Sequence, residues 1–130
     1  MKKRIIALMS IAFLSIVSCS KKDDDKDPLV GEWVAEKVVS NGVDLGINEC
    51  TQQTRVSISE KHFNYYTFYN RSDNSECLSV VTSYDYVKEN NIIKNVETSG
   101  TAGFYYSLEE NNTRLRISQS SSNYVIFKRK

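Results

Sequence analysis

The sequence is poor in the residues on which most catalytic and metal sites depend. Its 130 residues include one histidine, His62, three cysteines and five glycines, and no two cysteines form a Cys-x-x-Cys pair. It has no Ser-centred elbow, no cluster of metal ligands and no glycine-rich phosphate loop. His62 has no partner that the sequence can identify. We therefore predict a protein that is not an enzyme, with no catalytic residue, no metal and no cofactor.

The first eighteen residues have the features of a leader. Met1 to Arg4 is basic, and Ile5 to Val17 is an apolar run of thirteen residues. A helix that spans a membrane needs about 20 apolar residues, so this run is too short to be one. We expect residues 1–18 to be a signal peptide.

Cys19 follows this apolar run directly. The sequence Ile16-Val17-Ser18-Cys19 resembles the lipobox of bacterial lipoproteins. The resemblance implies cleavage after Ser18, lipidation of Cys19 and attachment to a membrane through the N-terminal lipid. Two or three acyl chains would hold the protein there permanently. The alternative is an ordinary signal peptide that happens to contain a cysteine.

Residues 19–27 continue the chain as a polar tether. Ser20 to Asp27 contains only Ser, Lys and Asp, with no apolar side chain to bury. A serine after the lipidated cysteine resembles the sorting signal for the Gram-negative outer membrane. The acidic cluster Asp23 to Asp25 resembles a surface-export signal, or it only keeps the tether solvated. The expected location is the outer membrane, lipid-anchored, on the periplasmic face or the cell surface.

The chain after the leader has no excess of positive charge. Loss of Lys2, Lys3 and Arg4 leaves fourteen basic residues, three fewer than the whole chain has, against sixteen acidic ones, a net charge of about −2. Binding to phosphate backbones needs clustered cations that release counterions, so we expect no nucleic-acid partner. The basic end formed by Lys128, Arg129 and Lys130, with Arg114 and Arg116 nearby in a hairpin, is either a contact for anionic lipid or a solvated edge.

Cys50 and Cys77 are the cysteines left after Cys19. In an oxidising envelope, two cysteines in an otherwise cysteine-free domain are most simply a disulfide. Two free buried thiols are the alternative.

Short β-type runs, separated by polar turns, occupy the chain from Val30 onward, and no long helical pattern occurs. Asn41-Gly42 is a typical hairpin turn. In one run, Leu115 and Ile117 are expected to point inward and Arg114 and Arg116 outward. We predict an all-β protein, an antiparallel up-and-down meander of about eight strands that closes into a barrel or a sandwich. The runs are Val30 to Val39, Thr54 to Ser59, His62 to Tyr69, Leu78 to Val87, Asn91 to Val96, Thr101 to Leu108, Thr113 to Gln119 and Asn123 to Arg129.

The triplet Gly31-Glu32-Trp33 opens the first of these runs. With a β meander behind it, this triplet resembles the start of a lipocalin, and residues 28–130 are similar to the small lipocalin-like domains of bacterial lipoproteins. The resemblance implies a lipocalin-like barrel with Trp33 at its closed end. It also implies that a basic side chain of the last strand lies across the Trp33 ring, and Arg129 is the best match.

Aromatic residues recur with period two on the faces expected to point inward. They would form an apolar wall with a few hydroxyl groups, as a site for a small apolar or amphipathic ligand requires. A barrel of eight strands is also narrow enough for such residues to fill it, which would leave an interaction or structural module whose macromolecular partner is unknown. The expected wall residues are Phe63, Tyr65, Tyr84, Tyr86, Phe104 and Tyr106.

Overall fold

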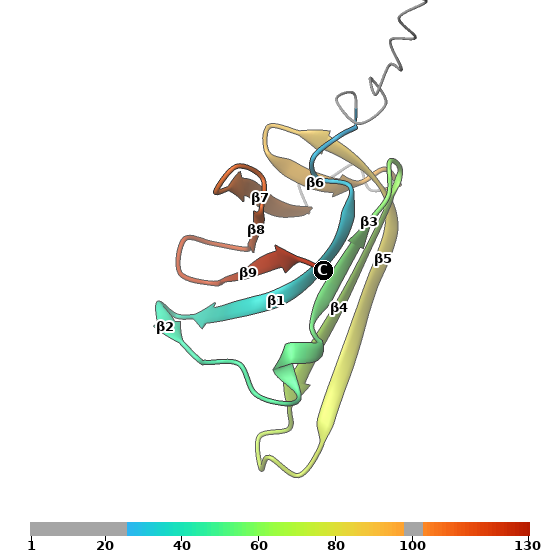
Figure 1. The fold of residues 1–130 in the computed structure, drawn as a ribbon. Helices are drawn as coiled ribbons and strands as arrows, with labels where there is room; N and C mark the ends of the chain where they lie inside the picture. Colours follow the sequence, from blue (N-terminus) through green and yellow to red (C-terminus); the bar gives the residue numbers. More distant parts are fainter. Residues whose placement is uncertain (1–25, 98–102) are drawn as a thin grey trace, which may run out of the picture.

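The computed structural model describes residues 26–97 and 103–130, which form an antiparallel β-barrel (Figure 1). The predicted signal peptide and Cys19 lie outside the described residues. β1 pairs with β3, each strand from β3 onward pairs with the next one along the chain, and β1 pairs with β9 to close the barrel. The strands are β1 (Gly31–Ser40), β2 (Val43–Asp44), β3 (Arg55–Ile58), β4 (His62–Asn70), β5 (Cys77–Glu89), β6 (Ile92–Asn95), β7 (Gly103–Glu109), β8 (Arg114–Ser118) and β9 (Tyr124–Arg129).

The predicted fold class is confirmed, because each of the eight predicted runs overlaps one strand of the barrel. The first two residues of the predicted run from Thr101 to Leu108 lie outside the described residues. The structure contains one further strand, β2, which lies outside the eight predicted runs. It has two residues and forms a hairpin with β1. Its turn is Asn41-Gly42, where both residues have positive φ, 50° and 78°. This conformation is the one that favours Asn-Gly in two-residue hairpins.

The chain enters the barrel through a turn at Asp27 to Val30. The amide of Val30 donates to the carbonyl of Asp27 at 3.0 Å, and the Asp27 side chain accepts from the amide of Leu29 at 2.9 Å. Leu29 is thereby directed into the barrel, where it is fully buried. Gly31, with φ of 149°, then begins β1.

The core follows the alternation of the strands. Leu115 and Ile117 are buried in β8, as predicted, and Arg114 and Arg116 flank them. The sequence did not settle the register of the last strand, because both of its faces are apolar. In the structure Phe127 is fully buried in the core.

A disulfide joins Cys50 to Cys77, which confirms the predicted pair. It ties the connection between β1 and β3 to the start of β5. The same connection contains a short 3₁₀ turn, η1 (Thr51–Gln53), and ends at the buried Thr54. The Thr54 hydroxyl accepts from the Phe68 amide at 2.9 Å, and the Thr54 carbonyl accepts from the Ala35 amide at 2.9 Å. Thr54 therefore links β1 to β4 directly before β3, the strand that pairs with both, begins.

The hairpin of β4 and β5 extends well past the neighbouring strands (Figure 1). β4 and β5 pair from His62 with Asp85 to Asn70 with Cys77, whereas β5 pairs with β6 only from Tyr86 to Glu89. Within residues 26–97 and 103–130, no helix is long and apolar enough to cross a membrane.

Candidate functional site

One end of the barrel is sealed by Trp33, and we refer to it as the closed end. Trp33 is fully buried, and its indole Nε1 donates to the carbonyl of Leu29 at 3.0 Å. The residues packed in the same core include Val56 and Phe127. The Leu29 carbonyl is the hydrogen-bond partner that the buried indole needs, because an unpaired N–H in the core costs free energy.

Arg129 lies across the outer side of this seal. Its guanidinium carbon is 4.1 Å from the centroid of the Trp33 ring, and its Nε donates to the carbonyl of Asn112 at 3.0 Å. Two further bonds run to the carbonyls of Val30 and Pro28. The register explains the contact, because Trp33 and Arg129 are direct neighbours on β1 and β9. Gly31 gives the guanidinium room, since a Cβ there would lie 3.0 Å from Arg129 Nη1.

The middle of the barrel is filled by aromatic rings. Phe63 is fully buried, and its ring centroid lies 5.2 Å from that of Tyr84 and 5.9 Å from that of Phe104. Tyr86 is also buried, and its hydroxyl donates to the carbonyl of Ser59 at 2.7 Å. Tyr106 packs against the same cluster. Four of the six expected wall residues, Phe63, Tyr84, Tyr86 and Tyr106, therefore fill the interior and do not line the cavity at the other end of the barrel.

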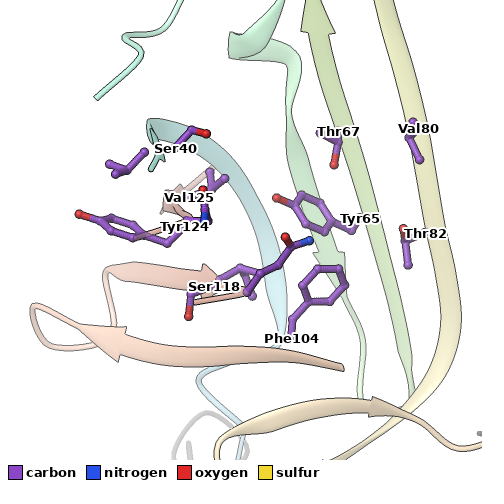
Figure 2. A pocket seen from close by; sticks show the side chains of 13 residues that line it. Ser40, Tyr65, Thr67, Val80, Thr82, Phe104, Ser118, Tyr124 and Val125 are labelled. Atoms are coloured by element: carbon purple, nitrogen blue, oxygen red, sulfur yellow. The ribbon is translucent and has the colours of Figure 1, made fainter. Parts of the chain in front are cut away.

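A cavity of about 430 Å³ lies at the other end of the barrel, which we refer to as the open end. Figure 2 shows the rings of Tyr65 and Phe104 among its lining residues, and their centroids are 5.4 Å apart. These two are the predicted ligand-binding residues that the structure brings to the cavity. The complete lining is Val39, Ser40, Tyr65, Thr67, Val80, Thr82, Phe104, Ile117, Ser118, Gln119, Asn123, Tyr124 and Val125.

No residue of this lining has a charged side chain at neutral pH. Four are aliphatic, three are aromatic and six carry hydroxyl or amide groups. Burial raises the pKa of Tyr65 to about 12, although a hydrogen bond with Thr67 acts in the opposite direction. The Tyr65 hydroxyl therefore stays protonated at neutral pH. The cavity offers apolar surface and neutral hydrogen-bonding groups, a combination suited to an uncharged amphipathic molecule.

The polar side of the cavity comes from residues that the sequence analysis did not select. Ser118, Gln119 and Asn123 belong to the hairpin between β8 and β9 or to its ends. This hairpin is fixed to the β1 turn, because the Asn41 amide donates to Asn123 Oδ1 at 2.9 Å and the Gly42 amide to the Ser122 carbonyl at 2.9 Å. The only signal in the sequence was the Asn-Gly turn itself, which does not reveal the hairpin that it contacts.

A second cluster of polar side chains lies on the outer face of β4 and β5. His62 contacts Asp85 through Nδ1 at 2.7 Å and Ser83 through Nε2 at 3.0 Å, two partners that the sequence alone did not identify. The Ser83 hydroxyl donates to Asn64 Oδ1 at 2.6 Å. A histidine activates a serine nucleophile by accepting the proton of its hydroxyl. The Ser83 proton is directed at Asn64, so His62 does not activate Ser83 in this way. The His62 and Asp85 side chains are 44% and 66% exposed, and we interpret the cluster as a cross-strand surface network.

The basic residues near the closed end are largely paired. Arg114 contacts Glu36 at 2.6 Å, and Arg116 contacts Glu109 at 3.5 Å. These pairs favour the solvated-edge interpretation over a lipid contact for the two arginines, because neither has its charge available. Among the residues that the structure describes, no group of three or more His, Cys, Asp or Glu side chains could hold a metal ion.

The family of this barrel follows from comparison with known proteins. The family model of the lipocalin-like domain matches residues 29–117, which is most of the chain. The chain therefore belongs to the family of lipocalin-like domains. Comparison with curated proteins and with solved structures gave no match. The lipocalin-like barrel defines the protein as a ligand-binding or structural module.

Proposed function

We propose that this chain is a non-catalytic binding protein, anchored by lipid to the outer membrane, that holds a small uncharged amphipathic molecule at the open end of its barrel. The observation that carries the proposal is the neutral cavity of about 430 Å³ above the Tyr65 and Phe104 rings. Its volume lies in the range of small-molecule sites. Aromatic faces would contact the apolar part of the ligand, and the hydroxyl and amide groups of Thr67, Ser118 and Gln119 would orient its polar part.

The proposal divides the chain into a signal peptide of residues 1–18, a lipidated Cys19 with a tether to residue 27, and a barrel of residues 28–130. The position of the first described residues supports this order. Asp27 is paired with Lys88, and the Pro28 carbonyl accepts from Arg129, so the chain enters at the closed end. A tether there would leave the open end facing away from the membrane, on the periplasmic face or at the cell surface, where a ligand can enter.

Native mass spectrometry and thermal melts of the purified protein test the ligand site. Ser118→Phe places a large ring in the cavity and should abolish both a co-purified small molecule and the stabilisation by added ligand. Ser121→Phe is the matched control, because Ser121 is exposed in the same hairpin and does not line the cavity. A ligand at a hundred times its dissociation constant adds about 2.7 kcal/mol of stability to the wild type and to the control.

A filled barrel that acts as an interaction or structural module is the second candidate. The aromatic cluster around Phe63 favours it, because four of the expected wall residues are used for packing. Tyr84→Ala should destabilise in either case, since Tyr84 lies in the cluster and not in the cavity lining. The decisive variants are therefore those at Ser118. If a panel of fatty acids, sterols and haem shifts no melt, and no small molecule co-purifies, the filled-barrel module is the correct reading.

The anchor has a separate test. Cys19→Ser should give a precursor that incorporates no labelled fatty acid and no longer fractionates with membranes. Acyl labelling equal to that of the wild type would contradict lipidation of Cys19 and would leave the ligand site unaffected.

A further inference from the structure

Among the residues that the structure describes, β5 has a long edge without a neighbouring strand. It runs from Cys77 to Glu89, and β6 covers only Tyr86 to Glu89. The Asp85 carbonyl accepts the amide of Val96 at 3.0 Å and marks the end of the covered part. From Cys77 to Tyr84, no other strand of the described residues pairs with the side of β5 that faces away from β4.

The backbone groups on this edge can be identified from the hydrogen bonds at its end. The Tyr86 amide points to β4, where it donates to Lys61, whereas the Asp85 carbonyl points to β6. Because neighbouring residues of a strand direct their N–H and C=O groups to opposite sides, Ser79, Val81 and Ser83 present theirs to the open edge. Such a row of groups is a template for another strand.

The edge lacks the features that usually prevent pairing. Cys77 to Tyr84 contains no charged residue and no proline, and it is rich in Val, Thr and Ser. The Val80 and Val81 residues on it are 51% and 56% exposed. Its centre, Ser79-Val80-Val81-Thr82-Ser83, is also nearly symmetric about Val81 in its sequence.

We propose that two copies of this chain associate through their β5 edges, antiparallel, with the two-fold axis at Val81. Val81 then pairs with Val81 of the second copy, and Ser79 pairs with Ser83. The segment is uncharged, so no like charges meet in this register, and about six backbone hydrogen bonds form. This pairing is isologous and therefore closes as a dimer.

The second copy also adds to the cavity. Val80 and Thr82 of β5 line its wall, and in an antiparallel pair directly opposed side chains lie on the same face of the sheet. Val80 of one copy would lie opposite Thr82 of the other, on the side of the cavity. Each barrel would thus receive two wall residues from its partner, at the side where its own β6 is too short. The proposed dimer goes beyond ligand binding and does not depend on the identity of a ligand.

Cysteine cross-linking of the full-length chain tests the register. Val81→Cys should give a disulfide-linked dimer with copper phenanthroline, because paired Cα atoms about 5.5 Å apart allow the bond. Ser79→Cys alone should not cross-link, because the two equivalent positions would be about 13 Å apart. Ser79→Cys and Ser83→Cys expressed together should cross-link to each other. Val87→Cys, on the covered part of β5, is the control and should not cross-link.

A charge variant tests the same edge without cross-linking. Val81→Lys sets two lysines opposite each other and should weaken the dimer about tenfold or more in sedimentation experiments. Val87→Lys, also at an exposed valine of β5, should not weaken it. A wild-type protein that is monomeric at all concentrations would overturn the proposal, as would a dimer that Val81→Lys does not weaken. If the monomer instead binds a synthetic peptide of residues 78–84, the occupant of the edge is an extended peptide and the dimer is refuted.

Discussion

Trp33→Ala is the sharpest test of the closed end. The wild-type side chain is fully buried, contacts the Arg129 guanidinium and donates to the Leu29 carbonyl, and all three contributions are lost together. Deletion of a buried large aromatic side chain costs about 3–5 kcal/mol. Because small domains have stabilities of about 5–15 kcal/mol, this loss is a large part of the total. At about 4–8 °C per kcal/mol for a domain of this size, the melting temperature should fall by at least about 12 °C.

Unfolding has to be followed by circular dichroism, because Trp33 is the single tryptophan and its removal eliminates the tryptophan fluorescence of the protein. Trp33→Phe separates packing from hydrogen bonding: it keeps an aromatic ring but leaves the Leu29 carbonyl unpaired, at a cost of about 1–3 kcal/mol. Lys128→Ala is the control, since Lys128 is exposed beside Arg129 and should melt like the wild type. If Trp33→Ala also unfolds within about 1 kcal/mol of the wild type, Trp33 does not seal the barrel.

Three other predictions concern the framework around the site. The double variant Cys50→Ser/Cys77→Ser should lose about 3.6 kcal/mol, the chain-entropy estimate for a loop of 27 residues, and unreduced wild type should show no reactive thiol from this pair. Gly31→Ala should destabilise the protein by about 1–3 kcal/mol, and by more than Gly42→Ala does, because only a Cβ at residue 31 crowds Arg129. Equal melting temperatures of the two variants would show that Gly31 is not needed to make room for Arg129. Burial works to raise the pKa of Asp27, but Lys88 and the Leu29 amide lower it below 3.8. A lowered folded-state pKa gives stability that is lost as the pH falls through that value, so Lys88→Met should flatten the loss of stability below about pH 4 in urea melts.

Local patterns were sufficient to predict the strands and the disulfide. Strand alternation is set by side chains two positions apart, so Leu115 and Ile117 could be assigned to the interior without any tertiary information. The Asn41-Gly42 turn was predictable because few residues tolerate positive φ. The Cys50 and Cys77 pair followed from the number of cysteines in a chain for which a leader is predicted.

Contacts that depend on register could not be predicted in the same way. His62 and Asp85 are 23 residues apart, and they meet because β4 and β5 pair in a register that places them opposite each other. A shift of one residue would move Asp85 to the other face. The contact between Trp33 and Arg129 also depends on register, and it was expected only from the resemblance to lipocalins. In the β1 and β9 pairing, a bulge between Ala35 and Lys37 changes the alignment of all later pairs.

The division of the aromatic residues between core and cavity has a single structural cause. β5 has thirteen residues and β6 has four, so the wall is complete around Phe63 and Tyr86 but incomplete beside Val80 and Thr82. Where the wall is complete, aromatic rings pack to the density of a protein interior. Where it is incomplete, the interior widens into the cavity, and the shortness of β6 leaves the β5 edge unpaired within the residues that the structure describes. The candidate ligand site and the proposed dimer contact are thus two results of one difference in strand length, and a longer β6 would remove both.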